Sequence, residues 1–139
     1  MESFRAFLVT DDLIFIPVDY EDGSHRINVY AKQTGQLQQS LAFPAPIFYV
    51  PIIADNKLLV VAESELFALD LTSYEEIWSV QFSSLSIPTI AGQTVVFGFT
   101  DVTSQFSSTG LGIAGVDISS GDKIFGSLAA SWQKIQEIS

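Results

Sequence analysis

Three stretches of the chain share one layout, and this internal repeat constrains the fold more than any other feature. Each stretch has a short apolar run, a polar turn, a second apolar run and then two further strand-like runs. The second runs are rich in β-branched and aromatic residues, which are typical of β-strands. They comprise residues 13–18, 58–62 and 94–99. Four strands in each of three copies predict three four-stranded antiparallel sheets.

The last turn of each copy aligns the repeats. Gly35, Tyr74 and Gly121 take equivalent places in that turn, with about 39 and about 47 residues between them. The difference arises at the hairpin between the second and third strands, which is longer in the first copy (residues 17–26) and in the third (residues 99–111). Because both hairpins join equivalent strands, we expect them on one rim. Units of about 40 residues with four strands each are typical of β-propeller blades.

The sequence around these turns resembles the PQQ-like β-propeller repeat of the quinoprotein alcohol dehydrogenase-like superfamily, over roughly residues 6 to 125. Repeats of that kind carry the motif Ala-x-Asp-x-x-Thr-Gly-x-x-x-Trp. The positions of this chain that keep the motif, or replace its Trp by another aromatic residue, are Thr34, Gly35, Ala68, Asp70, Trp78, Asp117, Gly121 and Phe125. The clearest departures are Gln39, which stands in the Trp place, and Tyr74, which stands in the Gly place.

The motif positions have structural roles that elementary physical chemistry explains. Glycine permits the left-handed backbone of a tight turn. Aspartate and threonine side chains hydrogen-bond with turn amides that otherwise lack partners. The large aromatic side chain is buried between blades. The motif therefore predicts the docking of neighbouring blades and not a catalytic site.

The expected fold is all-β, a partial β-propeller of three four-stranded antiparallel blades of the PQQ-like or WD-like kind. The blades are predicted at about residues 6–41, 51–80 and 88–126 of a single domain, 1–126. Residues 127–139 are predicted to be a tail, either the start of a further blade or a short helix. Propellers usually close with about four to eight blades. The three blades are therefore expected either to be part of a longer polypeptide or to be completed into a ring by another chain, and a homodimer would supply six blades.

The composition excludes several classes of partner. Six basic residues stand against 16 acidic ones, for a net charge of −10, so the clustered cations that nucleic acids and anionic membranes require are lacking. The longest apolar stretch, residues 43–54, is interrupted by prolines and is too short for membrane insertion. The absence of cysteine excludes disulfides and thiolate metal sites. No secretory signal is recognised, and a cytoplasmic location is expected if this is the full gene product.

The two longer hairpins supply the candidate binding rim, because loops on a rigid scaffold commonly carry binding sites. Its candidate residues are Tyr20, His25, Arg26, Phe99 and Phe106. His25 beside Asp22 could instead act as a general base or metal ligand, and the acidic cluster around them could hold Ca²⁺. The pair Asp22 and Gly23 is more typical of a solvated turn, so we expect no catalytic or metal-binding residue there.

Two polar patterns have an ordinary structural interpretation. Glu63 and Glu65 alternate, which would place both carboxylates on one face of a strand; a solvated strand edge explains them better than paired acid and base roles. The serines at positions 83, 84 and 86 lack a nearby histidine, so a hydrolase triad has no support. Gly110 and Gly112 precede a strand and not a helix, unlike the dinucleotide-binding fingerprint.

One aromatic pattern has two interpretations. Phe43, Phe48 and Tyr49 lie among three prolines. They are expected to form the link between the first two blades. If they are exposed, they would instead offer a surface for a partner.

The function expected from these features is a non-catalytic scaffold for protein–protein interaction or assembly, without a cofactor. The resemblance implies one enzymatic alternative, a fragment or subunit of a PQQ-dependent dehydrogenase-like propeller enzyme. Dehydrogenases of that superfamily hold PQQ and Ca²⁺ on the axis of a larger ring, often near two adjacent cysteines, whereas this chain has no cysteine. A third interpretation is purely architectural, an assembly subunit held by its open blade faces.

Overall fold

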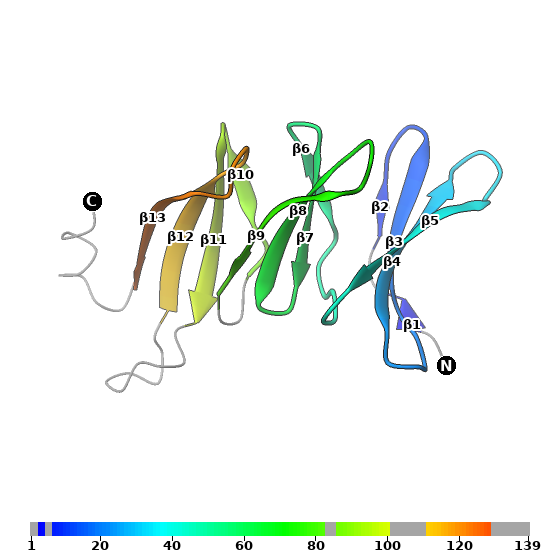
Figure 1. Ribbon diagram of the computed structural model, residues 1–139, viewed down its shortest axis with the longest axis horizontal. Coiled ribbons are helices and arrows are strands. Elements are labelled where there is room, and N and C mark those ends of the chain that lie inside the picture. The colour runs from blue at the N-terminus through cyan, green and yellow to red at the C-terminus, as the bar shows by residue number, and fades with distance from the viewer. Residues whose placement is uncertain (1–2, 5–6, 83–85, 101–110, 129–139) are drawn as a thin grey trace.

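The computed structural model describes residues 3–4, 7–82, 86–100 and 111–128 of the chain. Within these residues the secondary structure is entirely β-strand, in three antiparallel sheets that stand side by side in a row (Figure 1). This arrangement confirms the all-β fold and the three antiparallel blades. The described part of the chain contains no helix long and apolar enough to cross a membrane.

The first sheet has five strands in four positions. These strands are β1 (Ser3–Phe4), β2 (Leu8–Val9), β3 (Leu13–Asp19), β4 (His25–Ala31) and β5 (Leu37–Phe43). Both β1 and β2 pair with the same side of β3, and β4 and β5 follow in order. The sheet therefore has the width of a four-stranded blade.

The second and third sheets each have four strands in chain order. The second contains β6 (Ile52–Ala54), β7 (Lys57–Ala62), β8 (Glu65–Asp70) and β9 (Glu76–Gln81). The third contains β10 (Thr89–Ala91), β11 (Thr94–Thr100), β12 (Leu111–Asp117) and β13 (Lys123–Leu128). Each neighbouring pair of strands is antiparallel, so each sheet is a simple meander.

An irregularity at the same place in each sheet marks the three as structural repeats. The register between the last two strands shifts between Val29 and Tyr30, between Ala68 and Leu69, and between Gly115 and Val116. In consequence Gln39, Trp78 and Phe125 pair with Val29, Ala68 and Gly115, respectively. The three positions aligned from the motif are therefore equivalent in space.

Two apolar cores lie on opposite faces of the second sheet. Side chains alternate between the faces of a strand, so Leu58 and Val60 of β7 join the core shared with the first sheet, whereas Leu59 and Val61 join the core shared with the third. The sheet is buried on both faces, which explains why β7 is almost continuously apolar. We call the contact between the first and second sheets the first joint, and that between the second and third the second joint.

The longer hairpins differ in extent from the sequence prediction. Much of residues 17–26 is strand, because Pro17 continues β3 and Arg26 lies in β4, so the turn itself is limited to residues 20–24. This turn and the ends of β11 and β12 lie along the same edge of the row of sheets (Figure 1). Residues 101–110, which include Phe106, lie outside the described residues. The tail beyond Leu128 lies outside them as well, and β13 itself extends to that residue.

Candidate functional site

Trp78 joins the second sheet to the third. Its side chain is only 7% exposed and packs in the core of the second joint. The indole Nε1 donates a hydrogen bond of 2.8 Å to the carbonyl oxygen of Ile118. The ring lies directly on Gly121, where a Cβ atom would come within 2.6 Å of it. The second joint is therefore a large aromatic side chain seated on a glycine turn.

The turns that follow β4, β8 and β12 share one backbone conformation. The φ angles of Gly35, Tyr74 and Gly121 are 73°, 63° and 75°. In each turn the amide of this residue donates to a carbonyl four residues earlier, at 2.8, 2.8 and 2.7 Å. Tyr74 adopts the left-handed conformation although that conformation is unfavourable for residues with a Cβ atom, so the surrounding structure must impose it.

Aspartate side chains cap two of these turns. Oδ1 of Asp70 accepts hydrogen bonds from the amides of Thr72 and Ser73 at 2.8 and 2.9 Å. Oδ1 of Asp117 accepts from the two equivalent amides of the third sheet at 2.8 and 3.2 Å. The first sheet has Ala31 at this position and lacks the cap.

Acid is expected to weaken the Asp70 turn. The amide of Ser73, followed by that of Thr72, holds the pKa of Asp70 below its usual 3.8. Because the pKa of Asp70 is lower in the folded than in the unfolded chain, its carboxylate stabilises the folded protein above about pH 3.8. This stabilisation is lost as the pH falls through the folded-state pKa. Thermal unfolding below pH 4 should therefore depend less on pH in Asp70→Asn than in the wild type. Glu75→Gln, an exposed carboxylate in the same turn, is the control; an unchanged acid dependence in Asp70→Asn would contradict the role of this charge.

The first joint is built differently from the second. Gln39 stands where the second sheet has Trp78, and it is exposed. Tyr74 stands where the third sheet has Gly121, and its ring contacts Phe15 edge-on, with 6.4 Å between the ring centroids. Partial burial raises the pKa of the Tyr74 phenol. The first joint therefore lacks both the docking indole and the glycine on which an indole rests.

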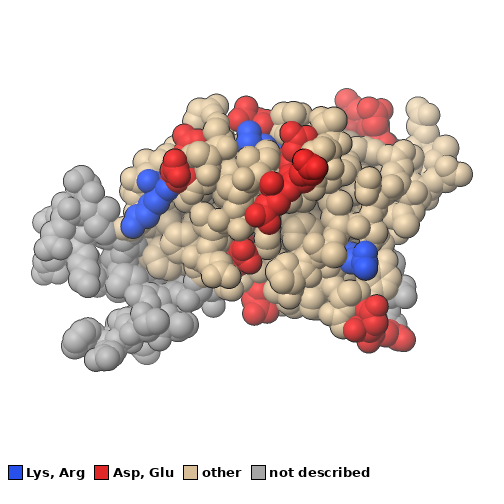
Figure 2. Space-filling view, in the orientation of Figure 1, with Lys and Arg blue, Asp and Glu red and all other residues tan. Residues whose placement is uncertain are grey.

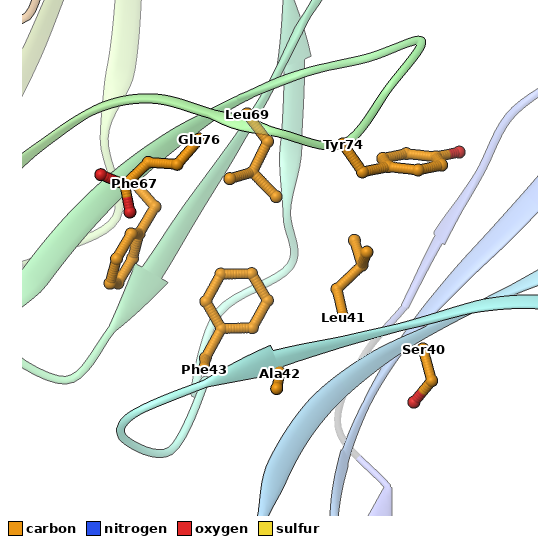
Figure 3. Close-up of a pocket in the computed structure, with 8 residues that line it drawn as sticks. All are labelled: Ser40, Leu41, Ala42, Phe43, Phe67, Leu69, Tyr74 and Glu76. Atoms are coloured by element: carbon orange, nitrogen blue, oxygen red, sulfur yellow. The ribbon is translucent and has the colours of Figure 1, made fainter.

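A cavity of about 290 Å³ opens at the first joint. Its lining residues are Ser40, Leu41, Ala42, Phe43, Phe67, Leu69, Tyr74 and Glu76. Leu41 and Phe43 of β5 face Leu69 of β8 across it (Figure 3). Phe43 and Phe67 also contact each other edge-on, 5.4 Å between centroids. Among the described residues that line the cavity, Glu76 alone carries a charge.

The outer face of the third sheet carries the counterpart of Trp78. Phe125 pairs with Gly115, and the neighbours of Gly115 on β12, Ala114 and Val116, point into the second joint. Because side chains alternate along a strand, Phe125 lies on the face that points away from the second sheet. Its ring rests against Gly115, at the position where a Cβ atom would stand.

The outer face of the first sheet carries a polar network instead. Asn28 is 3% exposed and is the buried polar residue of the described part of the chain. Its Nδ2 donates to the hydroxyls of Tyr20 and Tyr30 at 2.7 and 3.3 Å, and its Oδ1 accepts from Ser40 Oγ at 2.7 Å. Arg26 Nη1 donates in turn to Ser40 Oγ at 3.3 Å. The amide is therefore satisfied within its own sheet, as buried polar groups require.

The described residues of the predicted binding rim have different surroundings. Tyr20 and Arg26 belong to the network around Asn28, whereas His25 Nδ1 lies 2.8 Å from Asp19 Oδ1. Phe99 packs against the core of the second joint, and its ring centroid is 5.0 Å from that of Phe82. Phe99 is therefore partly buried. It lies on the same face of β11 as Val95 and Phe97, which belong to the core of the second joint.

The other sequence candidates keep structural roles where they are described. Asp22 Oδ1 accepts hydrogen bonds from the amide and hydroxyl of Ser24 within the turn. The prediction that Glu63 and Glu65 share a strand face is wrong, because Glu63 lies in the β7–β8 turn with a φ of 58°. The described residues contain no group of three or more His, Asp and Glu side chains placed to hold a metal ion.

The serine, glycine and aromatic patterns are described only in part. Ser86 Oγ accepts a hydrogen bond of 2.9 Å from the amide of Gly98, and Gly112 lies in β12; positions 83, 84 and 110 lie outside the described residues. In the aromatic pattern Phe43 is buried and Tyr49 packs against the core of the second joint, whereas Phe48 is 52% exposed. This segment links the first two sheets, as expected, and leaves Phe48 at the surface.

Neither a known protein family nor a curated protein sequence matches this chain. Solved structures do. The computationally designed Ika8 protein superimposes with a TM-score of 0.67 at 18% identity, over 90% of this chain and 36% of its own. A europium-containing methanol dehydrogenase gives 0.67 at 13% identity, over 91% and 25%. The WD40 domain of Neurospora crassa Pan2 gives 0.60 at 8% identity, over 90% and 52%.

These similarities establish the fold and no more. The chain has the architecture of three adjacent β-propeller blades, and it spans about a third of the Ika8 chain and a quarter of the methanol dehydrogenase. Identities this low carry no activity or cofactor from those proteins to this one.

Proposed function

We propose that this protein is a non-catalytic β-propeller scaffold that assembles by docking its third sheet on the first sheet of a second copy. The observation that supports the proposal is the second joint. There Trp78 of one sheet rests on the Gly121 turn of the next. The same two halves of a joint recur on the outer sheets. The third sheet carries an aromatic side chain on its outer face, and the first sheet carries a glycine turn.

The aromatic half is Phe125. It occupies the Trp78 position in the third sheet and lies on the outer face. Around it on that face are Val96, Gly98 and the 46% exposed Ile113, so the surface is apolar. Apolar inter-blade faces of this kind favour association.

The glycine half is the turn at Gly35. Its φ of 73° matches the 75° of Gly121, and no described atom lies within 4 Å of the place where a Cβ would stand. Gly35 is thus uncovered where Gly121 is covered by Trp78. Asn28, in the middle of β4, is already hydrogen-bonded within its own sheet, so a docked surface would not strand its polar group. Two copies joined reciprocally in this way would close a two-fold symmetric ring of six blades.

The mass in solution tests this assembly. Light scattering after gel filtration is expected to give a dimer of twice 15.2 kDa, and Phe125→Ser is expected to give a monomer with little change in circular dichroism. Phe125→Trp is expected to lower the dimer dissociation constant about fivefold, because an indole N–H adds a hydrogen bond like that of Trp78.

The matched control is Ile124→Ser, which removes the adjacent side chain, 52% exposed, at the register irregularity opposite Gly115 and Val116. It should leave the mass unchanged. A wild-type chain that remains monomeric at every concentration would refute docking on a second copy, and so would a dimer that is indifferent to both changes at Phe125.

A further inference from the structure

The cavity at the first joint corresponds to the space that Trp78 fills at the second. Leu41 and Phe43 of β5 are equivalent to Val80 and Phe82 in the second repeat, and both of the latter pack against the core around Trp78. At the first joint the equivalent indole is replaced by the exposed Gln39. The molecule therefore contains one aromatic docking site that is occupied by its own side chain and a second that is left open.

The size and lining of the cavity match a single aromatic side chain. Its volume of about 290 Å³ is just below the size at which ligand pockets usually begin, about 300 Å³, so a cofactor-sized molecule would not be enclosed. Leu41, Phe43 and Leu69 provide apolar walls, and the Tyr74 ring provides an aromatic one. Aromatic residues seated in such pockets dominate many protein interfaces.

The charge of the lining favours a basic neighbour beside that aromatic side chain. Glu76 is exposed and carries the charge of the lining. Acidic side chains are spread over the viewed face, from its upper edge through its middle to its lower edge, and basic ones are few (Figure 2), in agreement with the net charge of −10. A Lys or Arg next to the docked ring would pair with Glu76 and be attracted by the surrounding field.

We propose that this cavity binds an aromatic side chain, flanked by a basic residue, from a segment of a partner protein. The proposal deepens the scaffold role and rests on it only in taking the partner to be a protein. It does not require docking on a second copy, because the first joint lies within one chain.

A synthetic peptide provides the direct probe. The ¹⁵N-labelled chain is titrated with acetyl-Gly-Lys-Trp-Lys-Gly-amide, and amide chemical shifts report where the peptide binds. Saturable shifts are expected at Leu41, Leu69 and Tyr74. Replacing the peptide Trp by Ala, or both Lys by Glu, is expected to weaken binding at least tenfold.

Two pairs of protein variants make the test specific. Glu76→Gln is expected to weaken the peptide about threefold, within the range of exposed ion pairs. Glu75→Gln, the matched control, changes an adjacent exposed carboxylate that does not line the cavity, and binding should not change. The double variant Gln39→Trp with Tyr74→Gly reproduces the second joint and fills the cavity from within, so binding should fall at least tenfold. Tyr74→Gly alone keeps the cavity open and separates filling from loss of the tyrosine.

The outcomes are distinguishable from those of the assembly experiment. No shift at the cavity residues up to the solubility limit of the peptide would overturn the proposal, as would equal affinity for the Trp and Ala peptides or equal effects of Glu75→Gln and Glu76→Gln. A dimer that ignores the peptide would overturn this inference alone. A monomer that binds the peptide at the cavity would uphold it while overturning docking on a second copy.

Discussion

Replacing Trp78 by alanine is expected to lower the free energy of unfolding by about 3–5 kcal/mol, the usual cost of deleting a large buried aromatic side chain. The indole is almost fully buried between two sheets, and its Nε1 donates to Ile118. For a chain of this length the loss corresponds to a melting temperature about 10–20 °C lower. Circular dichroism at 218 nm, a wavelength typical of β-sheet, measures the transition without relying on tryptophan fluorescence.

The matched variant Trp78→Phe separates packing from hydrogen bonding. It retains most of the apolar area and loses the donor, so the expected cost is about 1–2 kcal/mol, including the unpaired Ile118 carbonyl. If Trp78→Ala unfolded at the same temperature as the wild type, the role of Trp78 as the main contact of the second joint would be wrong.

Replacing Gly121 by alanine should disturb the same joint from the opposite side. An alanine there must hold a φ of 75°, which costs about 1–2 kcal/mol for a residue with a Cβ. The added Cβ would also lie within 2.6 Å of the Trp78 ring, and forcing an extra carbon into a packed site costs about 1–3 kcal/mol more. The free energy of unfolding should therefore fall by about 2–5 kcal/mol in total.

Gly35→Ala is the control for this variant. Gly35 occupies the equivalent turn with a φ of 73°, but no described atom lies within 4 Å of the added Cβ. At a protein concentration low enough to keep the chain monomeric, it should show only the backbone cost. Equal effects of the two substitutions would mean that the contact between Trp78 and Gly121 contributes nothing beyond the turn conformation.

The fold was largely predictable from the sequence because its signals are local. The apolar, β-branched and aromatic runs such as residues 58–62 and the turn chemistry around Gly35 and Gly121 act over a few residues, and runs and turns of this kind recur along the chain. The three antiparallel sheets follow from them. The lengths of the strands at the long hairpins did not follow, because how far Pro17 and Arg26 continue their pairing depends on the partner strand.

The candidate sites were less predictable because they depend on which sheet faces which. Phe99 was predicted for an exposed rim, yet the register of β11 directs it against the second joint. The buried network around Asn28 has one sequence signal, an asparagine among apolar strand residues. The departures from the motif at Gln39 and Tyr74 are visible in the sequence. The cavity at the joint where they lie is visible only in the structure.

The sequence by itself determined the three repeats, their antiparallel strands and the equivalence of Gln39, Trp78 and Phe125 in the last strand of each copy. These properties depend on strand alternation and turn conformation, which are set by residues close together in the chain. The tertiary structure alone decided that Trp78 fills one joint while the other stays open beside Glu76. Whether a space is filled depends on side chains from two sheets meeting at atomic distances, and neither sheet encodes that contact without the other.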